Sequence, residues 1–186
     1  MPIPHDRLAS LLCAVLALLA AACVGVGVGV GEGAEPAALD LPGFRLLGPG
    51  VAGGGQPTAE GLADLAGAGY GLVINLRRPS EPLASEEGEL VRAAGLTYAA
   101  MPLGGDDLTA IHARELGELL AGETGAHVLL HCASGNRVGA LWGLHVGLRD
   151  GLDVAGTLAL ARASGMRSPS LAKCVRRAVE DAAAAP

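Results

Sequence analysis

VLLHCASGNRVGALWGL, at residues 128–144, joins an apolar run, a loop of small residues and a second apolar segment. The run that ends at His131 is short and uninterrupted, which is typical of a buried β-strand. Residues 139–148 have helical spacing, and the loop between the two elements enters this helix at about Val138. Ligands of open α/β sheets bind beyond the carboxyl ends of the strands, so this loop is where a functional site is expected first.

The loop CASGNR, residues 132–137, has the composition of an anion-binding turn with a nucleophile at its start. A helix N-terminus exposes unpaired N–H groups and a partial positive charge, so small residues curling around it can surround an oxyanion. Gly135 permits a left-handed turn, and Arg137 can bind two oxygens of a phosphate or sulfate group. The same positive field favours the nucleophilic thiolate of Cys132. The competing interpretation is a buried structural cysteine beside a solvated arginine.

The rest of the domain alternates strands with helices. Short apolar runs predict strands at residues 44–47, 71–76, 96–103 and 127–131. Helical spacing predicts helices at residues 58–66, 86–94, 109–120, 139–148, 153–163 and 168–181. The stretch VAGGGQPT, residues 51–58, is expected to turn the chain. This order predicts an α/β fold with a mostly parallel four- to five-stranded sheet and helices on both faces.

HCASGNRVGALWGL resembles the active-site stretch of bacterial tyrosine and dual-specificity phosphatase-like proteins, a group that includes the phosphatase-like domain attached to β-lactamase-like hydrolases. The similarity extends upstream to the GQPT turn, the helix after it and the INLR strand end within residues 53–77, and to YAAMPL at residues 98–103. It covers roughly residues 44–163. The resemblance implies the cysteine-phosphatase fold, a cysteinyl-phosphate intermediate and phosphomonoester hydrolysis without a metal or organic cofactor.

The resemblance also implies roles for the residues of the loop. Cys132 is the expected nucleophile, and Arg137 is the expected phosphate-binding arginine. His131 is expected to orient the loop, and a histidine with satisfied hydrogen bonds at a strand end is the alternative. Phosphate oxygens are expected to bind the backbone of Ala133, Ser134, Gly135 and Asn136.

Four more positions are expected near the substrate. The general acid is expected in GGDD, residues 104–107, where either Asp106 or Asp107 can protonate the leaving oxygen. Arg77 follows the INL strand end at the same sheet edge and can meet substrate charge. Gln56 lies in the glycine-rich turn that the resemblance places near the site. Ordinary solvated loop positions are the competing interpretation for all four.

Two features depart from the phosphatase pattern. Arg137 follows Cys132 by five positions, whereas the phosphatase signature places the arginine one position later; the shorter spacing is that of rhodanese-like sulfurtransferases. Val138 stands where phosphatases commonly carry a serine or threonine that eases release of the thiolate. The sequence therefore predicts a phosphoric monoester hydrolase. The alternatives are a sulfurtransferase that uses a Cys132 persulfide and a non-catalytic oxyanion-binding module.

The N-terminal segment is expected to direct export. Residues 11–23 have the form of a secretory signal, and LAAAC at residues 19–23 resembles a bacterial lipobox that would make Cys23 a lipidated N-terminus. Cleavage after Ala34 and an uncut anchor at residues 11–30 are the alternatives. The expected segments are a leader at 1–22, a glycine-rich tether at 23–38, a phosphatase-like domain at 39–180 and a tail at 181–186. This organisation predicts a periplasmic or cell-envelope protein.

Composition restricts the partners of the chain. Hydrophobic residues make up 51% of the 186 positions and aromatic residues only 2%, so leucine, valine and alanine must build the core. A net charge of -6 argues against a broad nucleic-acid or anionic-membrane surface. The expected partner is a phosphorylated substrate, with membrane contact only through the leader, and the oligomeric state is open. No histidine and cysteine spacing suits a metal site.

Overall fold

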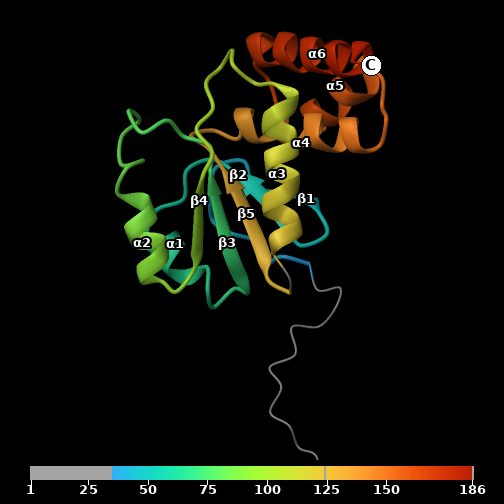
Figure 1. Ribbon diagram of the computed structural model, residues 1–186. Coiled ribbons are helices and arrows are strands. Elements are labelled where there is room, and N and C mark those ends of the chain that lie inside the picture. Colours follow the sequence, from blue (N-terminus) through green and yellow to red (C-terminus); the bar gives the residue numbers. More distant parts are fainter. Residues whose placement is uncertain (1–34, 124, 186) are drawn as a thin grey trace, which may run out of the picture.

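The computed structural model describes residues 35–123 and 125–185, which form a five-stranded sheet covered by helices on both faces (Figure 1). The strands are β1 (Arg45–Gly48), β2 (Val51–Gly54), β3 (Tyr70–Asn75), β4 (Thr97–Ala100) and β5 (His127–His131). Their order is β1-β2-β5-β3-β4, with β1 antiparallel to β2 and the other neighbours parallel. The predicted α/β class and mostly parallel sheet are confirmed.

The expectation that VAGG only turns the chain is wrong. These residues form β2, which is buried and pairs with β5 from Val51 against Val128 to Gly54 against His131. Small residues carry no strand signal of their own, because strand propensity comes from branched and aromatic side chains that pack on the sheet. Here neighbouring segments leave no room for larger side chains. A Cβ on Gly53 would lie 2.6 Å from Leu47 Cδ1 and 2.7 Å from Val138 Cγ1.

Helices α1 (Ala59–Asp64) and α2 (Glu87–Ala93) cover one face of the sheet. The hydroxyl of Thr58 caps α1 by accepting a hydrogen bond from the Gly61 N–H at 3.0 Å. Between these helices and the sheet lies the smaller core, which includes Leu62, Leu65, Val73, Val91, Leu96 and Leu129. Because α2 packs on this face, its buried Glu87 reaches the end of β5.

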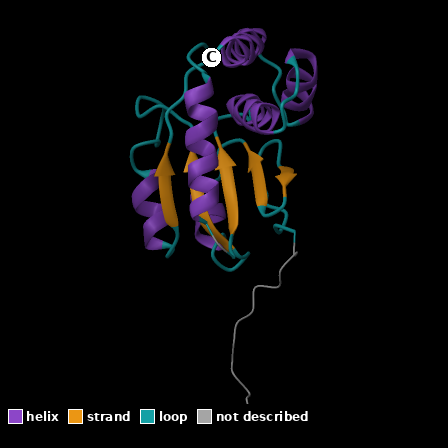
Figure 2. Cartoon of the chain, turned by 45° about the vertical axis from the view of Figure 1, so that its right-hand side comes forward, coloured by secondary structure: helices purple, strands orange, loops and turns teal. Residues whose placement is uncertain are grey.

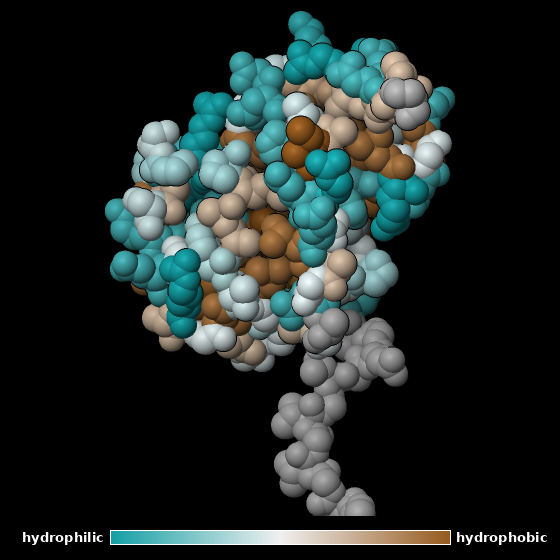
Figure 3. Space-filling model, viewed as in Figure 1, coloured by the Kyte–Doolittle hydropathy of each residue, from teal (hydrophilic) through white to brown (hydrophobic). Residues whose placement is uncertain are grey.

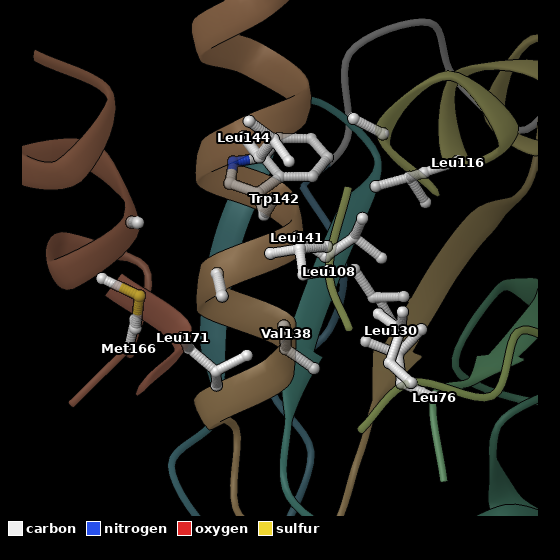
Figure 4. Packing of buried hydrophobic residues seen from close by; sticks show 14 of the residues in the cluster. Leu76, Leu108, Leu116, Leu130, Val138, Leu141, Trp142, Leu144, Met166 and Leu171 are labelled. Carbon is white, nitrogen blue, oxygen red and sulfur yellow. The ribbon is translucent and has the colours of Figure 1, made fainter. Parts of the chain in front are cut away.

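On the opposite side, α3 (Ala110–Gly122) runs along the sheet, and α4 (Asn136–Arg149), α5 (Val154–Ala163) and α6 (Pro169–Ala184) gather beyond the strand ends (Figure 2). Helix α4 lies in the interior, with α3 beside it and α5 and α6 packed on it. Figure 4 shows Val138 and Leu141 of α4 between the sheet residue Leu130 and the C-terminal residues Met166 and Leu171. Because α4 is buried along most of its length, the loop at its N-terminus is held in one position.

Several element boundaries differ from the expected ones. Helix α4 begins at Asn136 instead of residue 139, so Arg137 lies inside its first turn. Helix α6 continues to Ala184, through most of the expected tail, because alanine favours helix. The hydroxyl of Tyr70 donates to Ala37 O at 2.8 Å, which ties the end of the expected tether to the domain.

The expected leader and most of the tether lie outside the described residues. Within residues 35–123 and 125–185, no helix has the length and apolarity needed to cross a bilayer. On the face drawn in Figure 3, apolar residues gather toward the middle of the domain and hydrophilic residues surround them. A groove of about 530 Å³ opens between β4 and α3 and is lined in part by Ala99, Met101 and Leu119. It contains none of the residues of the loop after β5.

Candidate active site at the carboxyl edge of the sheet

The loop after β5 forms a cradle around the sulfur of Cys132. Cys132 is fully buried, and its backbone N–H donates to Gly54 O at 3.2 Å, which fastens the start of the loop to β2. Gly135 has a φ of 80° and precedes the first residue of α4, so the chain reverses there through a left-handed turn. Its N–H donates to Cys132 Sγ at 3.2 Å. The loop thus places a backbone donor directly on the sulfur of Cys132.

Arg137 is fixed over the cradle by a carboxylate and two strand ends. Its Nη1 and Nη2 donate to Glu81 Oε1 and Oε2 at 2.5 and 2.8 Å, a two-pronged pair. Nη1 also donates to Leu76 O at 3.3 Å and to Leu103 O at 3.0 Å. The loops after β3, β4 and β5 therefore meet at one guanidinium, as parallel strands require.

The two charges of this pair stabilise each other. The hydrogen bond from Arg137 lowers the pKa of Glu81 from 4.5 to about 2, against the opposing effect of burial. The hydrogen bond to Glu81 raises the pKa of Arg137, and the nearby Cys132 sulfur adds to this rise. Glu81 was not among the residues expected from the sequence. It lies 56 positions before Arg137 in a turn of ordinary composition, so no local pattern marks it.

A buried chain of hydrogen bonds supports the cradle from the α2 side. His131 Nε2 lies 2.7 Å from Glu87 Oε1, and Glu87 Oε2 accepts from Gln56 Nε2 at 2.6 Å. Gln56 Oε1 in turn accepts from Arg77 Nη1 at 2.5 Å, and Arg77 Nη2 donates to Pro82 O. His131, Gln56 and Arg77 are thus brought together, with the unforeseen Glu87 joining the first two.

The carboxylate of Glu87 is stabilised within this chain of hydrogen bonds although it is buried. Burial raises the pKa of Glu87, but the hydrogen bonds from His131 and Gln56 and the charge of Arg77 outweigh it, so the pKa is lowered overall. His131 Nδ1 has no hydrogen-bond partner among the described residues. The guanidinium of Arg77 is buried, and Gln56, Glu87 and the turn after β3 surround it. In this structure Arg77 holds the surrounding loops together. Its guanidinium is buried and is not exposed to a substrate.

The glycine-rich turn is pressed against the cradle. Gly55 forms an isolated bridge with Ser134, and Gln56 N donates to Ala133 O at 3.4 Å. A Cβ on Gly55 would lie 3.0 Å from Pro42 O and 3.1 Å from Ala133 O. Any larger residue would have to push one of these carbonyls aside, so glycine suits the close approach of the turn to the cysteine loop.

The two candidate acids differ in their surroundings. Asp107 Oδ1 accepts from Gly104 N at 2.7 Å, and its Oδ2 lies 3.2 Å from Arg78 Nη2. Burial raises the pKa of Asp107, but the Gly104 N–H and Arg78 lower it by more. Asp106 is 84% exposed, and its carboxylate is 4.0 Å from Arg78. Asp107 is therefore held ionised, while Asp106 is exposed and has only the longer contact with Arg78.

Residues 43–149 match the family model of the phosphatase-like domain of β-lactamase hydrolase-like proteins. The chain belongs to this family. A curated β-lactamase hydrolase-like protein of Xylella fastidiosa (strain Temecula1) is 34% identical over 94 residues, which are 48% of this chain and 22% of the relative. The match thus spans about a fifth of the length of that relative. The family predicted from the cysteine loop and its upstream segments is confirmed.

Solved structures share the fold at low identity. A Shewanella putrefaciens CN-32 protein has a TM-score of 0.62 and 22% identity, with 76% of this chain and 94% of that chain covered. TpbA of P. aeruginosa, solved in complex with pTyr, has a TM-score of 0.59 and 18% identity, with 75% of this chain and 86% of that chain covered. The core catalytic domain of the PP-IP phosphatase SIW14 of S. cerevisiae has a TM-score of 0.60 and 15% identity, with 77% of this chain and 90% of that chain covered. The fold expected from the resemblance is confirmed, and both the family model and these structures are those of phosphatases or phosphatase-like proteins.

In this phosphatase-like domain, the end of the cradle is joined to the C-terminal helices. Asn136 Oδ1 accepts from Arg167 N at 2.6 Å and from Ser168 N at 3.1 Å. Arg167 Nη2 donates to Ser134 O at 3.4 Å, so this arginine holds the outer side of the cradle. Neither contact was expected, because residues 134–136 and 167–168 are more than thirty positions apart.

Val138 has no polar function in this domain. It is 1% exposed and belongs to the core between α4 and the sheet (Figure 4). A valine side chain donates no hydrogen bond, so position 138 offers no hydroxyl to the sulfur of Cys132.

Proposed function

We propose that this domain hydrolyses phosphomonoesters through a phosphorylated Cys132. The observation that carries the proposal is the meeting of three groups: the Cys132 sulfur, the Gly135 N–H that donates to it, and an Arg137 guanidinium held by Glu81. A thiolate below an oxyanion cradle is arranged for in-line attack on phosphorus. TpbA was solved with pTyr and SIW14 is a PP-IP phosphatase, which supports a phosphorylated substrate here.

The proposed reaction has two steps. In the first, the thiolate forms a bond to phosphorus while the bond to the ester oxygen breaks, and a general acid gives this oxygen a proton. In the second, water attacks phosphorus, its proton passes to the same carboxylate, and the phosphorus–sulfur bond breaks to return the thiolate. Backbone N–H groups of residues 133–136 and Arg137 bind the non-bridging oxygens throughout.

Asp106 is the general acid in this proposal. Asp107 is occupied by Gly104 N and Arg78, and its lowered pKa opposes the protonated form that an acid requires. Asp106 follows the same strand end, which Arg137 holds through Leu103 O, and its side chain is free to turn toward the cradle. Asp107 keeps the loop in shape beside it.

The absence of a hydroxyl at position 138 slows the second step of the proposed reaction. A leaving thiolate without a hydroxyl donor is a poorer leaving group, so the phosphorus–sulfur bond of the intermediate breaks slowly. The proposal therefore includes a rate-limiting second step and accumulation of phosphorylated Cys132.

The test is phosphate release from an aryl phosphate by the reduced protein, compared with Cys132→Ser. Wild type is expected to turn over and to carry a phosphoryl group on Cys132 in the mass spectrum of the quenched reaction, and the variant to do neither. No release by a protein whose Cys132 is shown to be reduced would sink the proposal.

The spacing of Cys132 and Arg137 makes sulfur transfer the second candidate. It is tested by thiosulfate and cyanide in a parallel assay, in which uptake of one sulfur atom by Cys132 would favour the sulfurtransferase.

We further propose that the domain acts outside the cytoplasm, tethered at Cys23. The apolar run and LAAAC at residues 11–23 support this location. Expression of the full chain and of Cys23→Ser, followed by fractionation, tests it. The wild type is expected in the membrane fraction, extractable by detergent, and the variant in another fraction. Equal recovery of both in the cytoplasm would contradict the proposal.

A further inference from the structure

Leu83 has a backbone conformation that glycine normally adopts. Ala84 N donates to Glu81 O at 3.1 Å, which closes a four-residue turn with Pro82 and Leu83 at its centre. The φ angle of Leu83 is 63°, the one positive value found outside glycine in residues 35–123 and 125–185. Proline followed by a positive φ is typical of a type II turn, in which glycine or asparagine is preferred at the third position. A leucine there is strained by contact of its Cβ with the backbone.

Leu83 is also the most exposed large apolar side chain of the described residues. It is 74% exposed, whereas the next, Ile111, is 54% exposed. Both its backbone strain and its contact with water oppose the presence of a leucine in the isolated domain. A polar residue that tolerates a positive φ would be more stable at this position. The side chain is thus better explained by a ligand that covers it than by the stability of the fold.

The turn that presents Leu83 is built into the active site. Glu81, its first residue, binds Arg137 through both carboxylate oxygens at 2.5 and 2.8 Å. The carbonyl of Pro82 accepts from the buried Arg77. Two residues of chain span at most about 7 Å, so the Cα of Leu83 lies within that distance of the Cα of Glu81. Leu83 therefore lies two residues from the carboxylate that binds Arg137, on a turn held by the partly buried Arg137 and the buried Arg77.

We propose that Leu83 determines specificity by contacting an apolar leaving group attached directly to the phosphate. This inference rests on the proposed phosphatase function. The phosphate binds in the cradle, and the apolar group beyond the ester oxygen displaces water from Leu83. A rigid ring places apolar surface beside the turn, whereas a hydroxyl-rich alkyl phosphate places polar groups there. The domain should therefore prefer ring-bearing phosphates over phosphates of small polar alcohols.

Binding of a non-hydrolysable naphthylmethylphosphonate, measured by calorimetry, tests the inference without any turnover. Wild type is expected to bind it more tightly than inorganic phosphate. Leu83→Gly is expected to weaken the phosphonate roughly tenfold, because the apolar contact is lost, and to leave the affinity for inorganic phosphate unchanged. Its Tm should not fall, since glycine adopts this φ without strain. Leu83→Met should keep the wild-type affinity, and Leu152→Ala, which truncates a leucine of a distant loop, should change neither ligand.

The results separate this inference from the proposed function. Absence of phosphate release from 2-naphthyl phosphate would count against the phosphatase, whereas the phosphonate affinities concern Leu83 alone. The inference is wrong if wild type binds the phosphonate no better than phosphate, or if Leu83→Gly weakens both ligands equally. It is also wrong if Leu83→Gly binds both ligands as the wild type does.

Discussion

At the scale of single residues, the site depends on how Glu81 holds Arg137, the residue proposed to bind the oxyanion. Arg137 is partly buried and needs a fixed direction, and Glu81 gives it one through two parallel hydrogen bonds. The sequence indicated Arg137, because its distance from Cys132 is set within one loop. It gave no indication of Glu81, because the chain folds this turn back onto Arg137 only when β3 and β5 pair.

The ion pair of Glu81 predicts a pH-dependent stability. The pKa of Glu81 is about 2 in the folded protein, below its ordinary value of 4.5, so the pair stabilises the fold above pH 4.5 and this contribution is lost as the pH falls toward 2. Glu81→Gln should lower the free energy of unfolding at pH 7 by on the order of 2 kcal/mol. Urea unfolding at pH 7 and pH 2.5 should show this difference shrinking at the lower pH.

Glu118→Gln is the matched control for this measurement. Glu118 lies on the surface of α3, 4.0 Å from Arg114 and 72% exposed, so its loss should change stability little at either pH. An equal difference between wild type and Glu81→Gln at both pH values would contradict the expectation.

Asp106 and Asp107 should separate in a leaving-group comparison. If Asp106 is the acid, Asp106→Asn lowers kcat/KM, which reports the first step, about a hundredfold or more for a phenyl phosphate, whose leaving oxygen needs a proton. The same variant should barely affect kcat/KM for p-nitrophenyl phosphate, whose leaving group is already stable as an anion. Asp107→Asn should lower the rates of both substrates to a similar extent, because it loosens the loop. The opposite pattern would assign the acid to Asp107.

Val138→Ser should speed the second step of the reaction. A serine hydroxyl at this position can donate to the departing thiolate, whereas valine cannot. Stopped-flow measurement should show a smaller burst and a higher steady-state rate than wild type, with stability lower by about 1–2 kcal/mol from the buried hydroxyl. Val138→Ala, which also shrinks the side chain but adds no hydroxyl, should leave the burst unchanged. A burst unchanged in Val138→Ser would show that the second step is not limited in this way.

Helix α4 positions the site at the scale of elements. Its first turn contains Arg137, and its body is enclosed by the sheet, α3, α5 and α6. Contact with α5 is close because glycines face it: a Cβ on Gly143 would lie 2.5 Å from both Cα and Cβ of Ala161. Periodicity alone predicts that this helix exists. It does not show which helix lies against the glycines.

Gly143→Val should therefore separate α4 from α5. The added side chain has no space, so we expect a loss of roughly 3 kcal/mol or more in the free energy of unfolding, together with lower activity from a displaced cradle. Gly122→Ala is the control, since a Cβ at this last residue of α3 meets nothing within 4 Å. It should be neutral or stabilising by about 0.5–1 kcal/mol. Chemical denaturation of both variants measures the difference, and similar stabilities would refute the packing argument.

At the scale of the whole molecule, the site residues described above all belong to one domain. The contacts described above run from Gly54 to Ser168 and involve both faces of the sheet. We therefore expect the domain to be sufficient for the site, and the proposed export to affect only where the domain acts.

A protein that begins at residue 35 should keep the kcat/KM of the full chain toward an aryl phosphate. The described contacts of the site are all present in it, and so is the bond from Tyr70 to Ala37. Side-by-side kinetics of the two proteins, with their Tm values, provide the measurement. A large loss of kcat/KM at unchanged Tm would mean that the leader or tether contributes to catalysis.

The sequence by itself determined the alternation of strands and helices, the cysteine loop and the family. These follow from short-range patterns: apolar runs, helical spacing and six neighbouring residues. Only the tertiary structure decided that VAGG is a buried strand, that Glu81 holds Arg137, and that Glu87 joins His131 to Gln56. The physical reason is that these partners lie far apart along the chain. Small residues and ordinary acidic side chains acquire their roles only when the parallel sheet brings its loops to one edge.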